Sequence, residues 1–206
     1  MIKNIVFDMS RVLMEFDTRR YAMLAGVPEA DLERFRWEVY RSPEWLMIER
    51  EAITPAEAAA VMCANLPEHL HACVRKTVGG WWEEPIIPMQ GMAALVRELK
   101  EQGYGLYLLS NARREAATFF QRIPGSEHFD GVLFSYMAGV LKPQKEIYLR
   151  LYDQFRLDPA ECLFVDDVTA NIEAGISTGM RGIVFRGDTA HLRRQLRLAG
   201  VSVNEI

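Results

Sequence analysis

The sequence predicts an α/β protein with a doubly wound, mainly parallel, Rossmann-like sheet and an inserted all-helical cap. Three observations carry this prediction. The first apolar run, residues 2–7, has almost no polar alternation, which is typical of a strand buried on both faces of a parallel sheet. From residue 88 onward, short apolar runs alternate with longer runs of helical periodicity, as in successive βαβ units. Between these parts, residues 17–80 show helical spacing without a strand signal.

The first strand is expected to end at Asp8, and the helical insertion follows it. Capping side chains or prolines introduce several of its helices, and Thr54-Pro55-Ala56-Glu57 also offers a capping box. The expected helices span residues 20–25, 29–40, 42–51, 54–65 and 66–78. We therefore predict a cap domain over residues 17–80 and a core domain formed by residues 1–16 and 81–206, with Gly79-Gly80 as the candidate hinge.

The remaining chain is predicted to supply four further strands and the helices that connect them. A helix ends at Gly103, where glycine favours the left-handed turn that closes helices. In chain order we expect a helix over 88–102, a strand over 104–109, a helix over 113–121, a strand over 131–135, a helix over 143–155, a strand over 162–165, a helix over 170–178, a strand over 182–185 and a helix over 189–198.

Composition narrows the partners and the location. The 206 residues carry a formal charge of −4 and a pI near 5.7, so the chain lacks the basic surface that binding to a phosphate backbone requires. The three cysteines are widely spaced and contain no CxxC pair, which argues against a disulfide framework or a zinc site. The amino-terminal apolar run is too short for a signal sequence or a membrane span. We expect a cytoplasmic protein with neither nucleic acid nor membrane as a partner; no pattern indicates an oligomeric state.

Polar residues follow three of the predicted strands. Asp8 follows the first, Ser110-Asn111 the second and Asp166-Asp167 the fourth, while Lys142 precedes the helix over 143–155. In an open α/β sheet, ligands bind beyond the carboxyl ends of the strands, so these side chains should meet at one edge. Three carboxylates crowded there raise each other's pKa unless cations neutralise them. A lysine and Mg²⁺, which takes a few carboxylates together with phosphate oxygens, would meet that need.

The order and spacing of these residues resemble the haloacid dehalogenase-like hydrolase superfamily. The resemblance covers the whole chain and is closest to the helical-cap subclass, including small bacterial sugar-phosphate phosphatases and the phosphatase domain of soluble epoxide hydrolase. It implies a Mg²⁺-dependent phosphatase that acts on a small phosphorylated metabolite through an aspartyl-phosphate at Asp8. By this resemblance the catalytic positions are Asp8, Ser10 and Lys142, the substrate-binding positions are Ser110, Asn111 and Lys142, and the metal positions are Asp8, Ser10 through its backbone carbonyl, Asp166 and Asp167.

Ser10 departs from the family pattern. The family's phosphatases carry at this position a second Asp, which protonates the leaving oxygen and later activates water. A serine hydroxyl cannot do this near neutral pH, and losing such a group lowers rates by roughly 10²–10⁴. Two alternatives therefore stay open: a metal-independent 2-haloacid dehalogenase, and a family member that binds a phosphorylated ligand or a protein without turnover. The pair Asp166-Asp167 favours the phosphatase, because without a cation these carboxylates would repel each other.

Several of these residues also have simpler explanations. Ser110-Asn111 and Asp166-Asp167 can cap helices, since Ser, Asn and Asp bind the free N–H groups of a first turn. Lys142-Pro143 can form a solvated turn. Asn171, one turn into the helix over 170–178, is expected to orient the acidic pair. The four tryptophans are expected to pack between cap and core rather than to bind sugar: Trp37, Trp45, Trp81 and Trp82.

Overall fold

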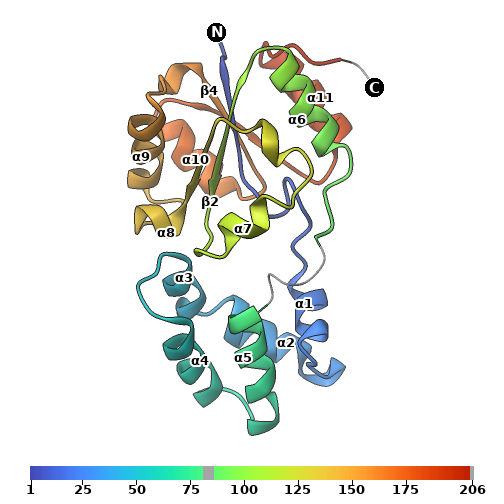
Figure 1. Cartoon of the computed structure of the whole chain (residues 1–206), viewed down its shortest axis with the longest axis vertical. Helices are drawn as coiled ribbons and strands as arrows, with labels where there is room; N and C mark the ends of the chain where they lie inside the picture. Colours follow the sequence, from blue (N-terminus) through green and yellow to red (C-terminus); the bar gives the residue numbers. More distant parts are fainter. Residues whose placement is uncertain (81–85, 205–206) are drawn as a thin grey trace.

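A parallel sheet of five strands forms the centre of the protein. The computed structural model describes residues 1–80 and 86–204 (Figure 1). The strand order is β3-β2-β1-β4-β5, so the first strand lies in the middle of the sheet, as its apolar sequence predicts. The strands are β1 (Asn4–Phe7), β2 (Gly105–Ser110), β3 (Gly131–Phe134), β4 (Cys162–Asp166) and β5 (Arg181–Val184).

Strand register aligns the polar strand ends. Phe7 of β1 pairs with Leu108 of β2 on one side and with Val165 of β4 on the other. The next residue, Asp8, donates its backbone N–H to the Val165 carbonyl at 2.9 Å. Asp8 and Asp166 therefore leave neighbouring strands at the same level of the sheet.

Two layers of helices cover the sheet. Alternate residues of each strand point to opposite faces, so Ile5 and Phe7 pack in one apolar cluster while Val6 packs in another. Figure 1 shows α6 and α11 on one side of the strands and α9 and α10 on the other. The first cluster takes in α6 (Met92–Glu101), α7 (Ala116–Phe120) and α11 (Thr189–Leu198); the second takes in α8 (Ser135–Ala138), α9 (Lys145–Phe155) and α10 (Thr169–Ser177). The α/β fold predicted from the sequence is confirmed.

The segment between β1 and β2 is helical and builds an apolar cluster of its own. Leu32, Phe35, Val39 and Ile48 are buried in it, and every buried member lies between residues 22 and 78. Figure 1 shows these helices together beyond the end of the sheet where α7 and α8 lie. They are α1 (Thr18–Leu24), η1 (Glu29–Asp31), α2 (Leu32–Phe35), the π-helical η2 (Arg36–Tyr40), α3 (Pro43–Glu49), α4 (Pro55–Ala64), η3 (Glu68–Leu70) and α5 (His71–Gly80). The division into domains at residues 17 and 80 remains a prediction.

Local capping explains where the cap helices begin. Ser42 accepts a hydrogen bond from the Trp45 N–H at the start of α3, with Pro43 at the first helical position. At α4, the capping box between Thr54 and Glu57 is present as predicted.

Several sequence-based boundaries are wrong, including the three that follow. The helix predicted from residue 88 begins only at Met92, because the preceding chain pairs with the segment after β1: the Glu15 N–H binds the Ile87 carbonyl at 2.8 Å and the Met89 N–H binds the Leu13 carbonyl at 2.9 Å. The helix predicted from residue 113 begins at Ala116. The strand predicted over 131–135 ends at Phe134, and Ser135 starts the short helix α8 instead.

The tryptophans divide. Trp45 is buried in the cap cluster, but Trp37 is 63% exposed, so its predicted packing is wrong. Trp81 and Trp82 lie outside the described residues.

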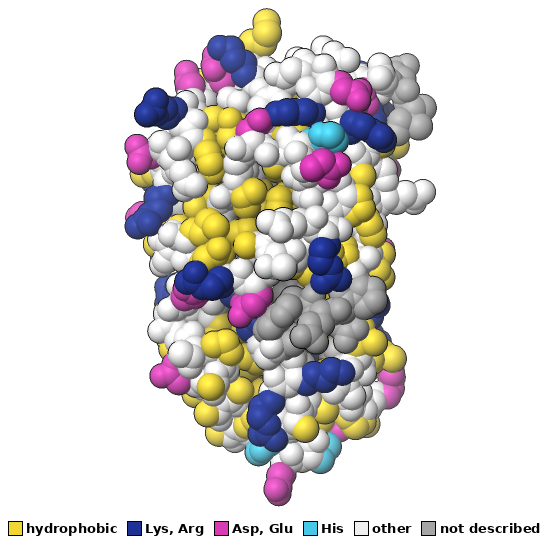
Figure 2. Space-filling model, in the orientation of Figure 1, with side chains coloured by type: hydrophobic (Ala, Val, Ile, Leu, Met, Phe, Trp, Pro, Cys, Tyr) yellow, Lys and Arg dark blue, Asp and Glu magenta, His cyan; other side chains and the backbone are white. Residues whose placement is uncertain are grey.

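The surface carries mixed charges. On the face shown in Figure 2, Lys and Arg side chains are scattered among Asp and Glu. In the described part of the chain, every helix is too short or too polar to cross a bilayer. The three cysteines are free thiols.

Candidate active site

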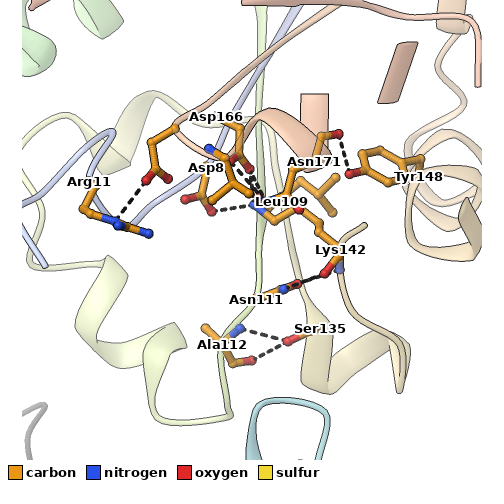
Figure 3. Close-up of polar contacts among 12 residues, drawn as sticks. Asp8, Arg11, Leu109, Asn111, Ala112, Ser135, Lys142, Tyr148, Asp166 and Asn171 are labelled. Carbon is orange, nitrogen blue, oxygen red and sulfur yellow. Dashed lines mark hydrogen bonds and ion pairs between the residues drawn. The ribbon is translucent and has the colours of Figure 1, made fainter. Parts of the chain in front are cut away.

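A buried lysine joins two strand-end carboxylates. The Lys142 ammonium group donates to Asp8 Oδ1 at 2.7 Å, to Asp166 Oδ2 at 2.6 Å and to the Leu109 carbonyl at 2.9 Å (Figure 3). The side chains of Lys142, Asp8 and Asp166 are all buried. The arrangement matches each donor of the ammonium group with an oxygen, which is what makes a buried charge tolerable.

Burial and charge pull the pKa values of this cluster in opposite directions. Burial raises the pKa of Asp8 to about 6, while the Lys142 charge acts to lower it. Burial acts to lower the pKa of Lys142, but the carboxylates of Asp8 and Asp166 outweigh it, so the pKa of the lysine is raised overall. Lys142 is therefore a fixed positive charge beside Asp8.

Asp166 is saturated with donors. In addition to Lys142, its Oδ1 accepts from the Val168 N–H at 2.7 Å, and the Asn171 amide approaches both of its oxygens at 3.1 and 3.0 Å. Asn171 thus orients the acidic pair through Asp166, in agreement with the sequence-based expectation (Figure 3). The Asn171 carbonyl in turn accepts from the buried Tyr148 hydroxyl at 2.7 Å.

Asp167 is more accessible and faces a different cation. Its Oδ2 lies 3.0 Å from Nε of Arg11, whose side chain is exposed. Burial raises the pKa of Asp167, and the Arg11 guanidinium opposes that rise. Arg11 has φ of 61°, a left-handed conformation at which L-residues other than Asn and Asp are uncommon. The backbone thus turns sharply between Asp8 and Val12, which brings Arg11 back toward the end of β4.

These carboxylates fit a hard cation. Asp8, Asp166 and Asp167 each offer one oxygen, and the three oxygens lie within 4.8 Å of one another. Lys142 neutralises only part of the charge. An oxygen-only ligand set that includes two or three carboxylates suits Mg²⁺.

Ser110 and Asn111 differ in what they can offer a ligand. Ser110 Oγ is buried and, among the described residues, has no hydrogen-bond partner, so its hydroxyl is available to a group in the cavity it lines. The Asn111 amide is engaged on the Lys142 backbone, donating to its carbonyl at 3.0 Å and accepting from its N–H at 2.8 Å. Neither residue starts a helix, because α7 begins five residues after Asn111.

A cavity of about 220 Å³ opens over these groups, between the strand ends and the cap. The core contributes Asp8, Ser110 and Lys142 to its lining. From the cap, Trp45, Ile48 and Glu49 line the cavity, together with Phe16, which packs against the cap cluster. Ser10, Arg11, Asn111, Arg113, Asp167 and Asn171 also line it.

Glu49, Arg11 and Arg113 are residues that sequence reasoning missed. Glu49 sits in the run Ile48-Glu49-Arg50-Glu51, which is typical of a solvated helix end. One signal could have found it: Glu49 lies four residues after Trp45, so both occupy one helical face. The Trp45 indole N–H donates to Glu49 Oε1 at 3.0 Å. Burial raises the pKa of the half-buried Glu49 to about 8, with the Trp45 bond opposing the rise.

Sequence comparison finds phosphatases. Residues 2–179 match the haloacid dehalogenase-like hydrolase family. A sesquiterpene phosphatase of Aspergillus oryzae is 29% identical over 79% of this chain and 82% of its own length. A phosphorylated carbohydrates phosphatase of Thermotoga maritima is 23% identical over 88% of this chain and 84% of its own length. Bifunctional epoxide hydrolase 2 of Rattus norvegicus is 31% identical, but over only 39% of this chain and 14% of its own length.

Solved structures share the fold. An enzyme of the same family from Bacteroides thetaiotaomicron, solved with magnesium and inorganic phosphate, superposes with a TM-score of 0.70 at 22% identity and covers 93% of this chain and 99% of its own. The L-2-haloacid dehalogenase of Xanthobacter autotrophicus superposes with a TM-score of 0.66 at 18% identity over 98% of this chain and 85% of its own. At these identities the superpositions establish the fold alone.

Proposed function

The chain belongs to the haloacid dehalogenase-like hydrolase family, and from this we propose that it is a Mg²⁺-dependent phosphomonoester phosphatase that works through an aspartyl-phosphate at Asp8. One observation carries the proposal. The Lys142 ammonium bridges Asp8 and Asp166 while the Ser110 hydroxyl stays unbonded among the described residues, so that a fixed positive charge and an available hydroxyl donor lie beside a carboxylate nucleophile. Phosphoryl transfer requires positioning and charge neutralisation of this kind.

Each core residue has a definite task in this reaction. An Asp8 oxygen attacks phosphorus, Lys142 offsets the charge on the nucleophile and the transferring group, and Ser110 donates a hydrogen bond to a phosphoryl oxygen. Asn111 holds the Lys142 backbone in place through its two amide bonds. This positioning role replaces the direct substrate contact expected for the Asn111 amide.

The acidic residues would share the metal unequally. Asp8, Asp167 and the backbone carbonyl of Ser10 would hold Mg²⁺ directly, because Asp166 already accepts from Lys142, Asn171 and the Val168 N–H. When bound, Mg²⁺ would neutralise charge on the phosphoryl oxygens. Asp166 would keep Lys142 and Asn171 in position.

The substrate is a small phosphorylated metabolite. The cavity of about 220 Å³ is smaller than the pockets of roughly 300–1,000 Å³ that hold drug-sized ligands. Its wall of Phe16, Trp45 and Ile48 suits the apolar face of a compact leaving group. A sugar phosphate has the right size and is consistent with the phosphorylated carbohydrates phosphatase among the relatives.

Phosphate release with and without metal tests the proposal. The chain is screened against phosphorylated metabolites in Mg²⁺ and in EDTA, and chloride release from 2-chloropropionate is measured in parallel. We expect Mg²⁺-dependent phosphate release that Asp8→Asn abolishes, since the amide is isosteric but not nucleophilic. Chloride release in EDTA without phosphate release would establish the dehalogenase instead. The Asp166-Asp167 pair speaks against that outcome.

A further inference from the structure

Position 10 does not supply the acid and base that the proposed reaction needs. A phosphate ester leaves as an alcohol only if its oxygen receives a proton, and an aspartyl-phosphate is hydrolysed efficiently only if its attacking water loses one. Near neutral pH, Ser10 can neither protonate the leaving oxygen nor take a proton from the attacking water. Among the described residues that line the cavity, the carboxyl groups are those of Asp8, Asp167 and Glu49. Asp8 is the nucleophile and Asp167 faces Arg11 and the metal position, which leaves Glu49.

Glu49 approaches the cavity from the cap. It is the last residue of α3, and the Trp45 indole fixes its Oε1. Among the described residues no second donor binds its carboxyl group, so Oε2 can exchange a proton with a ligand. The Trp45 ring lies 4.8 Å from the Tyr40 ring, centroid to centroid, which limits its movement.

The Glu49 backbone is tied to the core. The Ser135 hydroxyl, at the start of α8, donates to the Glu49 carbonyl at 2.5 Å. The same hydroxyl accepts from the Ala112 N–H at 2.8 Å, two residues after Ser110. The cap position of Glu49 is thereby fixed relative to the loop that follows Ser110 at the end of β2.

The surroundings keep the Glu49 carboxyl protonated near neutral pH. Burial is the dominant effect, and the Asp8 charge adds to it, while Lys142 and Arg113 act against it. Arg113 itself is buried and lies 3.5 Å from Glu115 through Nε, so part of its charge is already balanced. A protonated carboxyl group is the form that an acid must have when the ester bond breaks.

We propose, resting on the phosphatase function above, that Glu49 is the catalytic acid and base that replaces the carboxylate absent at position 10. As an Asp8 oxygen bonds to phosphorus, the bond from phosphorus to the leaving oxygen breaks and that oxygen takes the Glu49 proton. The Glu49 carboxylate then takes a proton from water, whose oxygen bonds to phosphorus. The bond from phosphorus to Asp8 breaks, phosphate leaves, and Glu49 is protonated again.

The test compares leaving groups in Glu49→Gln. Glu44→Gln, on the first turn of the same helix and away from the cavity, is the matched control. On a primary alkyl phosphate we expect kcat to fall by roughly 10²–10⁴, the usual contribution of general acid–base catalysis. On 4-nitrophenyl phosphate the first step needs little protonation, so Glu49→Gln should release a burst of nitrophenolate and then turn over slowly.

Rescue distinguishes a chemical role from a structural one. Adding Ser10→Asp to Glu49→Gln should restore kcat on the alkyl phosphate by about 10-fold or more, because the carboxylate returns from the core side. An equal loss on both esters with no burst and no rescue would overturn the proposal, as would wild-type kcat in Glu49→Gln. Asp8→Asn keeps the two proposals separable: if it retains turnover, the aspartyl-phosphate function fails; if it is inactive while Glu49→Gln is unimpaired, only the role of Glu49 fails.

Discussion

The core wall and the cap wall of the cavity differ in how firmly hydrogen bonds hold their side chains. On the core wall, Lys142 lies in the turn before α9 and Asp166 ends β4, and each makes short hydrogen bonds with several partners. On the cap wall, among the described residues, the Trp45 indole holds the Glu49 side chain and the Ser135 hydroxyl ties the Glu49 carbonyl to the core. The core wall can change only by disturbing the sheet, whereas the cap wall depends on how a separate helical cluster is seated. In the proposed reaction, the fold thus fixes where phosphate binds, while the cap determines the surroundings of the leaving group.

Removing Lys142 should have the largest effect, because it breaks the core wall at its centre. Lys142→Met leaves Asp8 and Asp166 buried without their shared cation, and breaking a buried ion pair typically costs about 3–5 kcal/mol in the free energy of unfolding. We expect that loss together with loss of turnover. Urea unfolding and phosphate release measure the two. Lys145→Met, at an exposed lysine three residues on, is the control; a Lys142→Met protein as stable as this control would show that the bridge adds no stability.

Substitutions of the adjacent residues Asp166 and Asp167 should have different effects. Asp167→Asn should raise the Mg²⁺ concentration required for half-saturation by about 10-fold or more, on the scale of lost groups around metal sites, with little change in stability. Asp166→Asn should instead lower the melting temperature, because the buried Lys142 loses a charged partner. Isothermal titration with Mg²⁺ and thermal unfolding report the two effects. Equal Mg²⁺ titrations for the two variants would refute the unequal sharing.

Arg11 should act as a weak competitor of the metal. Its guanidinium group is exposed and pairs with Asp167, and exposed pairs contribute about 0.2–1 kcal/mol. Arg11→Gln should therefore tighten Mg²⁺ binding by roughly 1.5- to 5-fold, the same energy expressed as a ratio. Calorimetric titration without substrate measures this directly. Weaker Mg²⁺ binding in Arg11→Gln would mean that Arg11 supports the metal position.

The last prediction concerns pH and the cap wall. The pKa of Glu49 in the folded protein, about 8, lies above its ordinary value, so folding favours its protonated form. The stability that this form provides is complete at pH values below the ordinary carboxyl pKa and is lost as pH rises through 8. The amide of Glu49→Gln cannot ionise. The melting temperature of this variant should therefore rise relative to that of the wild type as the pH increases from 5.5 to 8.5. A constant difference across that range would show that Glu49 has an ordinary pKa.

The core wall could be predicted from the sequence because strand register determines where its two strand-end carboxylates lie. Once residues 2–7 are recognised as a central parallel strand, Asp8 and Asp166 must meet at its carboxyl edge. The hydrogen bonds of Asn111 were not foreseeable, since its amide binds a backbone 31 residues away. The helix predicted from residue 88 failed because long-range pairing with Glu15 and Leu13 overrides local propensity. Glu49 was missed because its burial depends on where the cap rests on the core.

The hydroxyl of Ser135 has only one hydrogen to give. Its oxygen lies 2.5 Å from the Glu49 carbonyl and 3.2 Å from the Ala112 carbonyl, and it can donate to one of them at a time. If the cap lifts to admit substrate, rotation about the Cβ–Oγ bond of Ser135 points that hydrogen at the Ala112 carbonyl. The buried hydroxyl then still has an acceptor, so the penalty of about 1–3 kcal/mol for a buried donor without a partner does not oppose opening. The Ser135 hydroxyl, which binds the Glu49 carbonyl of the cap, thus has a second acceptor in the core, the Ala112 carbonyl.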